Sequence, residues 1–198
     1  MTKILILAGS PRKDANTLAL SAALAEGASA HGAAVETVRL ADLRIGYCLA
    51  CDHCRSHEGV CIQKDDMPGV LAEVEAADAV VFATPLYFHS FSAQLKTCID
   101  RFYSRYHARA LGGRTGALLV SSGTRDRAAT GLSSLFATYA SIVGLLGWTD
   151  GGIVWAGGHP HDGSIRTSPA LAEARALGAR LAAGGDGAGA AEDGTWPR

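Results

Sequence analysis

Five short apolar runs, separated by longer segments with helical spacing, constrain the fold of this chain more than any other feature. They are KILILA at 3–8, VETVRL at 35–40, AVVFA at 79–83, GALLVSS at 116–122 and GGIVWA at 151–156. Most are continuous rather than alternating, which is typical of strands that are buried on both faces of a sheet. Strand and helix therefore alternate, and this order predicts an α/β fold with a doubly wound, five-stranded parallel sheet and helices on both faces.

The helices are expected over residues 16–32, 65–78, 92–105, 128–146 and 168–183. Asn16 and Thr17 open the first helix as capping residues, and Gly32 ends it. At 198 residues the chain is long enough for one domain, which we place at 1–183 with a cysteine-loop insertion at 42–64. The Gly/Ala/Asp-rich segment 184–198 has no periodicity and is expected to be a flexible tail.

Composition argues against several classes of protein. Hydrophobic residues make up 48% of the chain, its net charge is -1, and no basic stripe indicates a nucleic-acid surface. No apolar run approaches the roughly 18 to 20 residues that cross a bilayer, so no membrane association is expected. The apolar N-terminal run stops at a Gly-Ser-Pro turn and predicts a first strand rather than an export signal, which indicates a reducing, cytoplasmic location.

The segment GSPRKDANT, residues 9–17, joins the first strand to the first helix, at the sheet edge where open parallel sheets bind ligands. It has neither the G-x-G-x-x-G pattern nor the Walker A pattern. It offers hydroxyl and amide groups of Ser10, Asn16 and Thr17, the guanidinium of Arg12, and the N–H groups of a helix N-terminus. This combination favours a pocket for one phosphate without a metal ion over an ordinary polar turn.

Two more segments follow strands at the same edge. In TPLYFHSFSAQLKTCIDR, 84–101, Pro85 stops the strand and leaves Leu86, Tyr87 and Phe88 either to cover the core or to support a flat aromatic ligand. SSGTRDRAATG, 121–131, is small and polar, which suits close approach to the polar edge of a ligand. Together the three segments fit a mononucleotide with a planar head group better than a sugar phosphate.

Four of the five cysteines lie in CLACDHCRSHEGVC, 48–61, with the spacing C-x2-C-x2-C-x6-C. Four thiolates are the ordinary ligand set of an iron-sulfur cluster. Zinc sites usually use two separate C-x2-C pairs, whereas these pairs overlap, and a reducing compartment disfavours disulfides. From the residues alone a cluster is favoured, and free or redox-active thiols and zinc stay open. Cys98 lies in a predicted helix and is expected in the core.

In their order and spacing, GSPRKDANT, the cysteine segment with the IQKDDM that follows it, and ATPLYFHSFSAQLKTCIDR resemble flavodoxin-like FMN proteins. The resemblance is to the iron-sulfur flavoprotein branch of the NADPH-dependent FMN reductase superfamily, and it spans about residues 3–125. It implies that Ser10, Arg12, Asn16, Thr17 and Leu18 bind the FMN phosphate, that Pro85, Leu86, Tyr87 and Phe88 line the isoalloxazine, and that Ser122, Gly123 and Asp126 close the site. It also implies a [4Fe-4S] cluster on Cys48, Cys51, Cys54 and Cys61, with Gly59 helping the loop to accommodate the long last gap. His159 and His161 could cover the flavin edge but are left outside the predicted site.

The leading interpretation is an FMN-dependent oxidoreductase whose cluster passes electrons between the flavin and an external carrier or small organic substrate. The expected electron partners are ferredoxin or NAD(P)H. The chain is also expected to form a homodimer or homotetramer that buries the aromatic and cysteine loops. Two enzyme alternatives are an NAD(P)H-dependent FMN or quinone reductase without a cluster, and a biosynthetic dehydrogenase of a small cyclic acid of the 2-amino-2-deoxyisochorismate type. The non-enzyme alternative is a flavodoxin-like electron carrier, which the near-neutral charge disfavours because small carriers are typically strongly acidic.

Overall fold

A computed structural model describes residues 1–108, 110–161 and 163–184, and in it five strands form one parallel sheet of order β2-β1-β3-β4-β5. The strands are β1 (Lys3–Ala8), β2 (Ala34–Arg39), β3 (Ala79–Pro85), β4 (Thr115–Ser121) and β5 (Thr149–Ala156). All five fall on the predicted apolar runs, and the order is the flavodoxin-like one. The predicted fold class is therefore confirmed. In this order β1 and β3 flank the point where the direction of winding reverses, which is where ligands bind in such folds.

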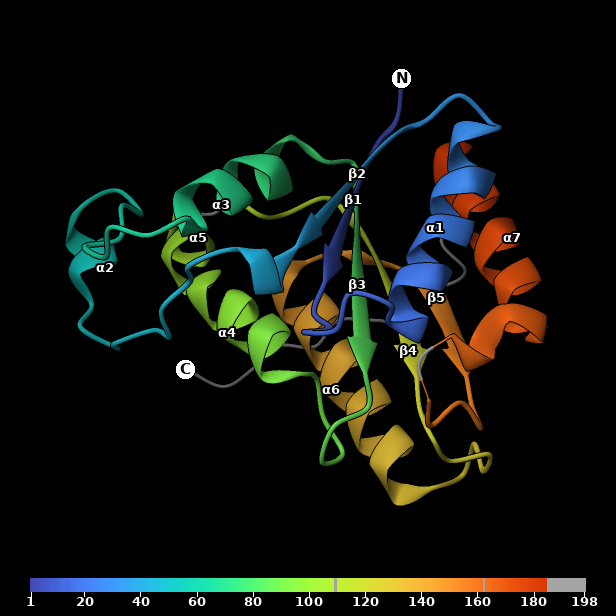
Figure 1. Cartoon of the computed structure of the whole chain (residues 1–198). Coiled ribbons are helices and arrows are strands. Elements are labelled where there is room, and N and C mark those ends of the chain that lie inside the picture. Colours follow the sequence, from blue (N-terminus) through green and yellow to red (C-terminus); the bar gives the residue numbers. More distant parts are fainter. Residues whose placement is uncertain (109, 162, 185–198) are drawn as a thin grey trace.

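Helices cover both faces of the sheet (Figure 1). On one face lie α1 (Asn16–Ser29) and α7 (Ala170–Ala182), and on the other α3 (Met67–Ala76), α4 (Ala93–Arg101) and α6 (Thr130–Leu146). Successive residues of β1 serve the two faces in turn, with Ile4 and Ile6 in the core beneath α1 and Leu5 and Leu7 in the other core. A strand that is buried in this way needs a continuous apolar run, which is why β1, β3 and β4 were predictable.

Two helix predictions were wrong in detail. The residue that precedes α1 is Ala15, without any side-chain cap, so Asn16 and Thr17 are the first helical residues and do not act as caps. The helix also ends at Ser29, and Gly32 instead supplies a left-handed turn with φ of 80° before β2. The helix expected over 92–105 is divided into α4 and α5 (Tyr103–His107).

The cysteine segment leaves the body of the molecule between β2 and α3. It passes through a short helical turn at Leu40–Asp42 and the single-turn helix α2 (His53–Ser56), which Figure 1 shows projecting beyond α4 and α5. A further short turn, Ser164–Thr167, precedes α7. Of the predicted tail 184–198, all but Gly184 lies outside the described residues. No helix in the described part of the chain is long and apolar enough to cross a membrane.

Candidate functional site

A pocket lies at the carboxyl ends of the strands, against the start of α1. Its lining brings together all the residues predicted to bind FMN except Leu18, Phe88 and Asp126, and adds Ala15, Ser121, His159 and Pro160. The full lining is Ser10, Arg12, Ala15, Asn16, Thr17, Pro85, Leu86, Tyr87, Ser121, Ser122, Gly123, His159 and Pro160. The pocket thus joins the segments that follow β1, β3, β4 and β5.

The start of α1 supplies unsatisfied polar groups to this pocket. Its first turn has no side-chain cap. The N–H groups of Leu18 and Ala19 donate to the Ala15 carbonyl, which leaves those of Asn16 and Thr17 for a ligand. Asn16 and Thr17 are buried, and among the described residues the Thr17 hydroxyl and Asn16 Oδ1 have no hydrogen-bond partner. Because an orphaned buried polar atom costs about 1–3 kcal/mol, these atoms indicate a polar ligand. A hydroxyl donor beside the positive end of a helix fits a phosphate oxygen.

The amide nitrogen of Asn16 is already used. Nδ2 donates to the carbonyl oxygens of His159 at 3.2 Å and His161 at 2.8 Å, which ties α1 to the segment after β5. Only the acceptor Oδ1 is therefore left for a ligand, and an acceptor suits a hydroxyl such as those of a ribityl chain rather than a phosphate oxygen. Ser10 Oγ, also buried, accepts from the backbone N–H of Arg12 at 3.3 Å and shapes the turn before the helix.

The loop after β1 is held against the segment that follows β3. The N–H of Gly9 donates to the carbonyl of Ala83 at 2.8 Å, and Ser92 Oγ donates to the carbonyl of Gly9 at 2.6 Å. A Cβ atom at Gly9 would lie only 2.6 Å from Ser92 Oγ and 2.7 Å from Leu95 Cβ. Only glycine fits here, and this close approach fixes the phosphate loop relative to the aromatic segment.

The aromatic segment forms a tight hairpin. Tyr87 and Ser90 exchange backbone hydrogen bonds of 3.1 and 2.9 Å, and the two residues between them, Phe88 and His89, have φ of 43° and 65°. Non-glycine residues in this conformation cost about 1–3 kcal/mol each and concentrate at ligand-binding sites. His89 packs over Gly131 at the start of α6, where a Cβ would lie 2.6 Å from its ring. Tyr87 therefore faces the pocket on a strained but anchored loop.

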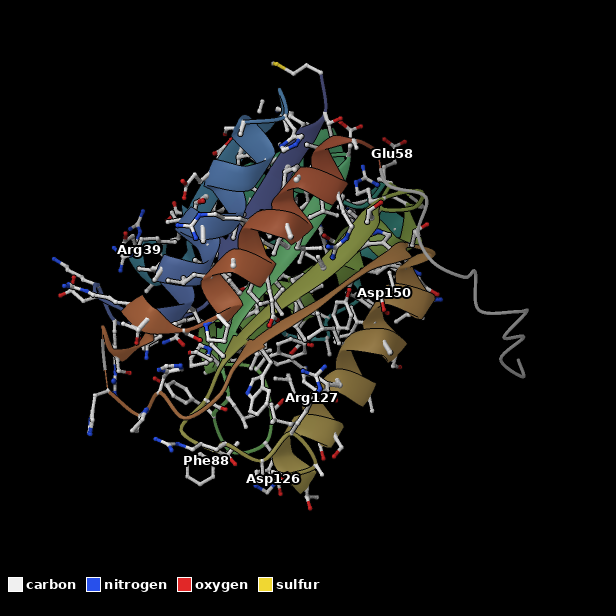
Figure 2. All side chains as sticks on the ribbon, turned by 90° about the vertical axis from the view of Figure 1, so that its right-hand side faces the viewer. Arg39, Glu58, Phe88, Asp126, Arg127 and Asp150 are labelled. Atoms are coloured by element: carbon white, nitrogen blue, oxygen red, sulfur yellow. The ribbon has the colours of Figure 1, made fainter. Side chains whose placement is uncertain are left out.

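Phe88 and Asp126 lie at the same end of the molecule but outside the pocket lining (Figure 2). Phe88 is fully exposed at the hairpin tip, and the Asp126 carboxylate accepts from the backbone N–H of Ala128 at 2.8 Å. Ser122, by contrast, lines the pocket and accepts from the Trp155 indole N–H at 2.8 Å. The guanidinium of Arg127 lies 5.8 Å from the Trp155 ring centroid, which holds this wall of the site in place.

The four clustered cysteines meet at a second location. Cys48, Cys51, Cys54 and Cys61 are all reduced thiols and all line one small hollow, of about 20 Å³. Burial raises the pKa of Cys54, and the other three cysteines are close enough to raise it further. A hollow of this size holds about one water, so a cluster would have to part the four side chains.

The donor set, four cysteine thiols around one hollow, is the ordinary ligand set of an iron-sulfur cluster. In the described part of the chain, no three Cys, His, Asp or Glu side chains are close enough together to hold one metal ion. A [4Fe-4S] cluster places its four cysteines on four different irons, so its sulfurs lie farther apart than those around one ion. The loop is also strained, since Ala50, Asp52 and Glu58 all have φ between 50° and 54°.

A buried arginine closes the cysteine loop, and the sequence reasoning missed it. Arg101 is 2% exposed and donates to Asp65 through both nitrogens, at 2.6 and 3.2 Å, to the Gly46 carbonyl at 2.8 Å and to Cys61 Sγ at 3.5 Å. Burial alone would lower the pKa of Arg101, but Asp65 and Cys61 raise it above its usual value. Burial alone would raise the pKa of Asp65, but hydrogen bonds from Arg101, Gly46 and Met67 lower it.

A family model for NADPH-dependent FMN reductases matches residues 2–158. The chain belongs to this family. The match covers β1 to β5, the cysteine loop and all of the pocket lining except His159 and Pro160. It classes the chain among flavin-dependent oxidoreductases and supports FMN as its flavin.

Proteins named iron-sulfur flavoprotein are among its relatives. One from Archaeoglobus fulgidus is 37% identical over 139 residues, which are 70% of this chain and 68% of that protein. A second from the same organism is 38% identical over 112 residues, 57% of this chain and 50% of that protein. One from Methanosarcina thermophila is 34% identical over 125 residues, 63% and 65% of the two chains. These matches confirm the resemblance to the iron-sulfur flavoprotein branch, although the chain spans only half to about two thirds of these relatives.

Solved structures show the same fold. The NAD(P)H:quinone oxidoreductase from Methanothermobacter marburgensis superposes with a TM-score of 0.73 and 22% identity, over 91% of this chain and 96% of that one. An FMN-dependent NADH-azoreductase from Bacillus anthracis, solved in complex with FMN, gives a TM-score of 0.71 and 18% identity, over 92% and 100%. At these identities the likeness establishes the fold and leaves the substrate open.

Proposed function

We propose that this FMN reductase family member is an oxidoreductase that binds FMN in the pocket and a [4Fe-4S] cluster on the cysteine loop. When bound, FMN accepts a hydride and releases single electrons, and a cluster exchanges one electron at a time, so the pair couples two-electron to one-electron chemistry. The side chains then have three tasks: to bind the phosphate, to orient the flavin ring, and to hold the cluster ligands.

The observation that carries the proposal is the orphaned hydroxyl of Thr17, buried at an uncapped helix start inside a pocket at the sheet's switch point. There Thr17 would donate to a phosphate oxygen, together with the N–H groups of α1 and with Arg12. Asn16 Oδ1 would accept from a ribityl hydroxyl. One phosphate site without a diphosphate motif fits FMN and not FAD.

The ring would lie beside the segments that follow β3 and β4. Pro85, Leu86 and Tyr87 provide apolar surface on one side of the pocket, and Ser122 and Gly123 provide polar groups and close backbone approach on the other. Leu18, Phe88 and Asp126 remain predicted contacts. Phe88 and Asp126 lie outside the pocket lining, so a second chain or a movement of their loops would be needed to bring them to the flavin.

The chain would assemble as a homodimer or homotetramer. Several large apolar side chains around the cysteine loop are at least half exposed: Tyr47 at 73%, Leu49 at 53%, Val60 at 54% and Ile62 at 50%. These side chains and the fully exposed Phe88 are apolar surfaces that subunit contacts would cover. The proposed electron partners are NAD(P)H at the flavin and a one-electron carrier such as ferredoxin at the cluster.

One alternative has support of its own. The small size of the hollow between the cysteines would suit four free thiols, and then the chain would act as an NAD(P)H-dependent FMN or quinone reductase. The two proposals differ in what the cysteines contribute to electron exchange.

Stopped-flow bleaching of the flavin absorbance separates them. Cys54→Ser should leave FMN bound but slow exchange with one-electron carriers far more than reduction by NAD(P)H. Cys98→Ala is the matched control, because Cys98 is a buried thiol in α4 that does not line the hollow. If NAD(P)H reduces all three proteins rapidly and equally while no one-electron carrier reacts with any, the cluster proposal fails and the reductase without a cluster stands.

A further inference from the structure

Arg101 links three separate points of the chain around the cysteines. It is the last residue of α4, and its guanidinium bonds to Gly46 before the cysteines, to Cys61 as the last of them, and to Asp65 after them. Asp65 reinforces the closure, since its carboxylate also accepts from the backbone N–H of Gly46 at 3.0 Å and of Met67 at 3.2 Å. The two ends of the loop are therefore fixed to each other and to the core through one ion pair.

The contact with sulfur goes beyond what closure requires. Hydrogen bonds to Asp65 and to the Gly46 carbonyl would be enough to pair the Arg101 guanidinium, yet its Nη2 also donates to Cys61 Sγ. Within the described residues, no other cysteine sulfur of the loop accepts a hydrogen bond from a charged side chain. A charge-assisted donor favours a sulfur that carries negative charge. The four proposed ligands are therefore unequal, and Cys61 has the cationic neighbour.

We propose that Arg101 is the positioning residue of the cluster: it fixes Cys61 as a ligand and raises the reduction potential of the cluster. The inference rests on the proposed function. The physical reason is that reduction adds an electron to an already anionic cluster, so a nearby cation and an N–H donor to a ligand sulfur stabilise the reduced form more than the oxidised form. Asp65 opposes the effect, because its carboxylate partly neutralises Arg101.

Two variants that should shift the reduction potential of the cluster in opposite directions test the proposal. Asp65→Asn keeps the donor to Cys61 but removes the neutralising carboxylate, so the cluster potential should rise. Because this variant leaves Arg101 without its ionic partner, its folded state is checked by urea unfolding before the potential is measured. The double variant Arg101→Met with Asp65→Leu removes both members of the buried pair, which avoids leaving one charge unpaired, and also removes the sulfur hydrogen bond, so the potential should fall. We expect each shift to correspond to about a tenfold change in the ratio of reduced to oxidised cluster, or about 59 mV for a one-electron couple.

Arg114→Met is the control. Arg114 is also partly buried and donates to carbonyl oxygens of Val74 and Glu75, and among the described residues no hydrogen bond or ion pair joins it to the cysteine loop. The measurement is a redox titration of anaerobic protein followed by electron paramagnetic resonance, with iron content determined for each variant. The control should keep the wild-type potential and the wild-type iron content.

The outcomes are distinguishable. Potentials that move in opposite directions at full iron content support Arg101 in this role. Unchanged potentials, shifts of the same sign in both variants, or an equal shift in Arg114→Met would refute the role of Arg101 while leaving the cluster in place. Loss of iron from the double variant alone would show that the ion pair closes the loop, and the potential of Asp65→Asn against the wild type would then decide the role of Arg101: a rise supports it and an unchanged potential refutes it. Wild-type protein that binds no iron would refute the proposed cluster, and the role of Arg101 with it.

Discussion

Replacement of Thr17 with valine should change stability and FMN affinity in opposite directions. Valine has the shape of threonine and a similar helix propensity, so Thr17→Val removes the orphaned hydroxyl with little other change. A buried polar atom without a partner costs about 1–3 kcal/mol. The apo-protein should therefore become more stable by about 1 kcal/mol, which is about 2–4 °C in Tm for a chain of this size.

The same substitution should weaken FMN binding. A hydrogen bond to a charged group contributes about 1.5–3 kcal/mol, and each 1.4 kcal/mol is tenfold in Kd, so the Kd for FMN should rise by about 10- to 150-fold. Titration of apo-protein with FMN, followed by quenching of flavin fluorescence, measures the Kd, and thermal unfolding without flavin measures the Tm.

Ser21→Ala is the matched control for this experiment. Ser21 is a buried hydroxyl one turn further along α1, and it already donates to the Thr17 carbonyl at 2.9 Å. Its loss should leave the Kd for FMN unchanged. A Thr17→Val protein that loses apo stability and keeps the wild-type Kd would show that the hydroxyl does not serve a ligand, and the argument from orphaned atoms would fail.

Other predictions follow from the closure of the loop and from the exposed surface. Asp65→Asn should lower the free energy of unfolding at pH 7 by about 3–5 kcal/mol, because it leaves a buried cation unpaired. The pKa of Asp65 is lowered by folding, so its contribution is present above its unfolded pKa of about 3.9 and is lost as the pH falls below that value. The difference in free energy of unfolding between wild type and Asp65→Asn, measured with urea, should therefore become smaller below about pH 4. A difference that does not change with pH would contradict the assigned ion pair. Gly9→Ala should raise the Kd for FMN, since its Cβ would collide with Ser92, and a wild-type Kd would mean that the loop adjusts freely. Sedimentation should find a dimer or tetramer, which Phe88→Ser with Ile62→Ser weakens, whereas a wild-type monomer at high concentration would contradict the proposed assembly.

The sheet was predictable because the sequence pattern that identifies a buried strand lies within the strand itself. The three central strands, β1, β3 and β4, are buried on both faces, so a continuous apolar run identifies each of them without knowledge of its neighbours, as for β3 with all seven residues buried. The edge strands β2 and β5 are only partly buried. The phosphate loop was also found, because its position after β1 follows from the strand order. The tight hairpin at Tyr87 was not, because Phe88 and His89 are unusual residues for two successive left-handed positions.

The rest depended on distant contacts. Asn16 was taken for a cap, but polar residues at a helix start serve equally as caps or as ligand-binding groups, and only its bonds to residues 143 and 145 positions away distinguish the two. Arg101 carried a signal that could have been used. It follows Cys98 by three residues, on the buried face of α4, where a lone arginine requires a buried partner.

The central claim is that one chain holds both FMN and a four-cysteine cluster. Flavin, iron and sulfide analysis of anaerobically purified protein tests it most directly, with Cys51→Ser and Cys98→Ala prepared alongside. The account predicts about one FMN and about four irons per chain in the wild type and in Cys98→Ala, and FMN without the cluster in Cys51→Ser. Wild-type protein that binds FMN but no iron, or iron that is retained in Cys51→Ser, would contradict it.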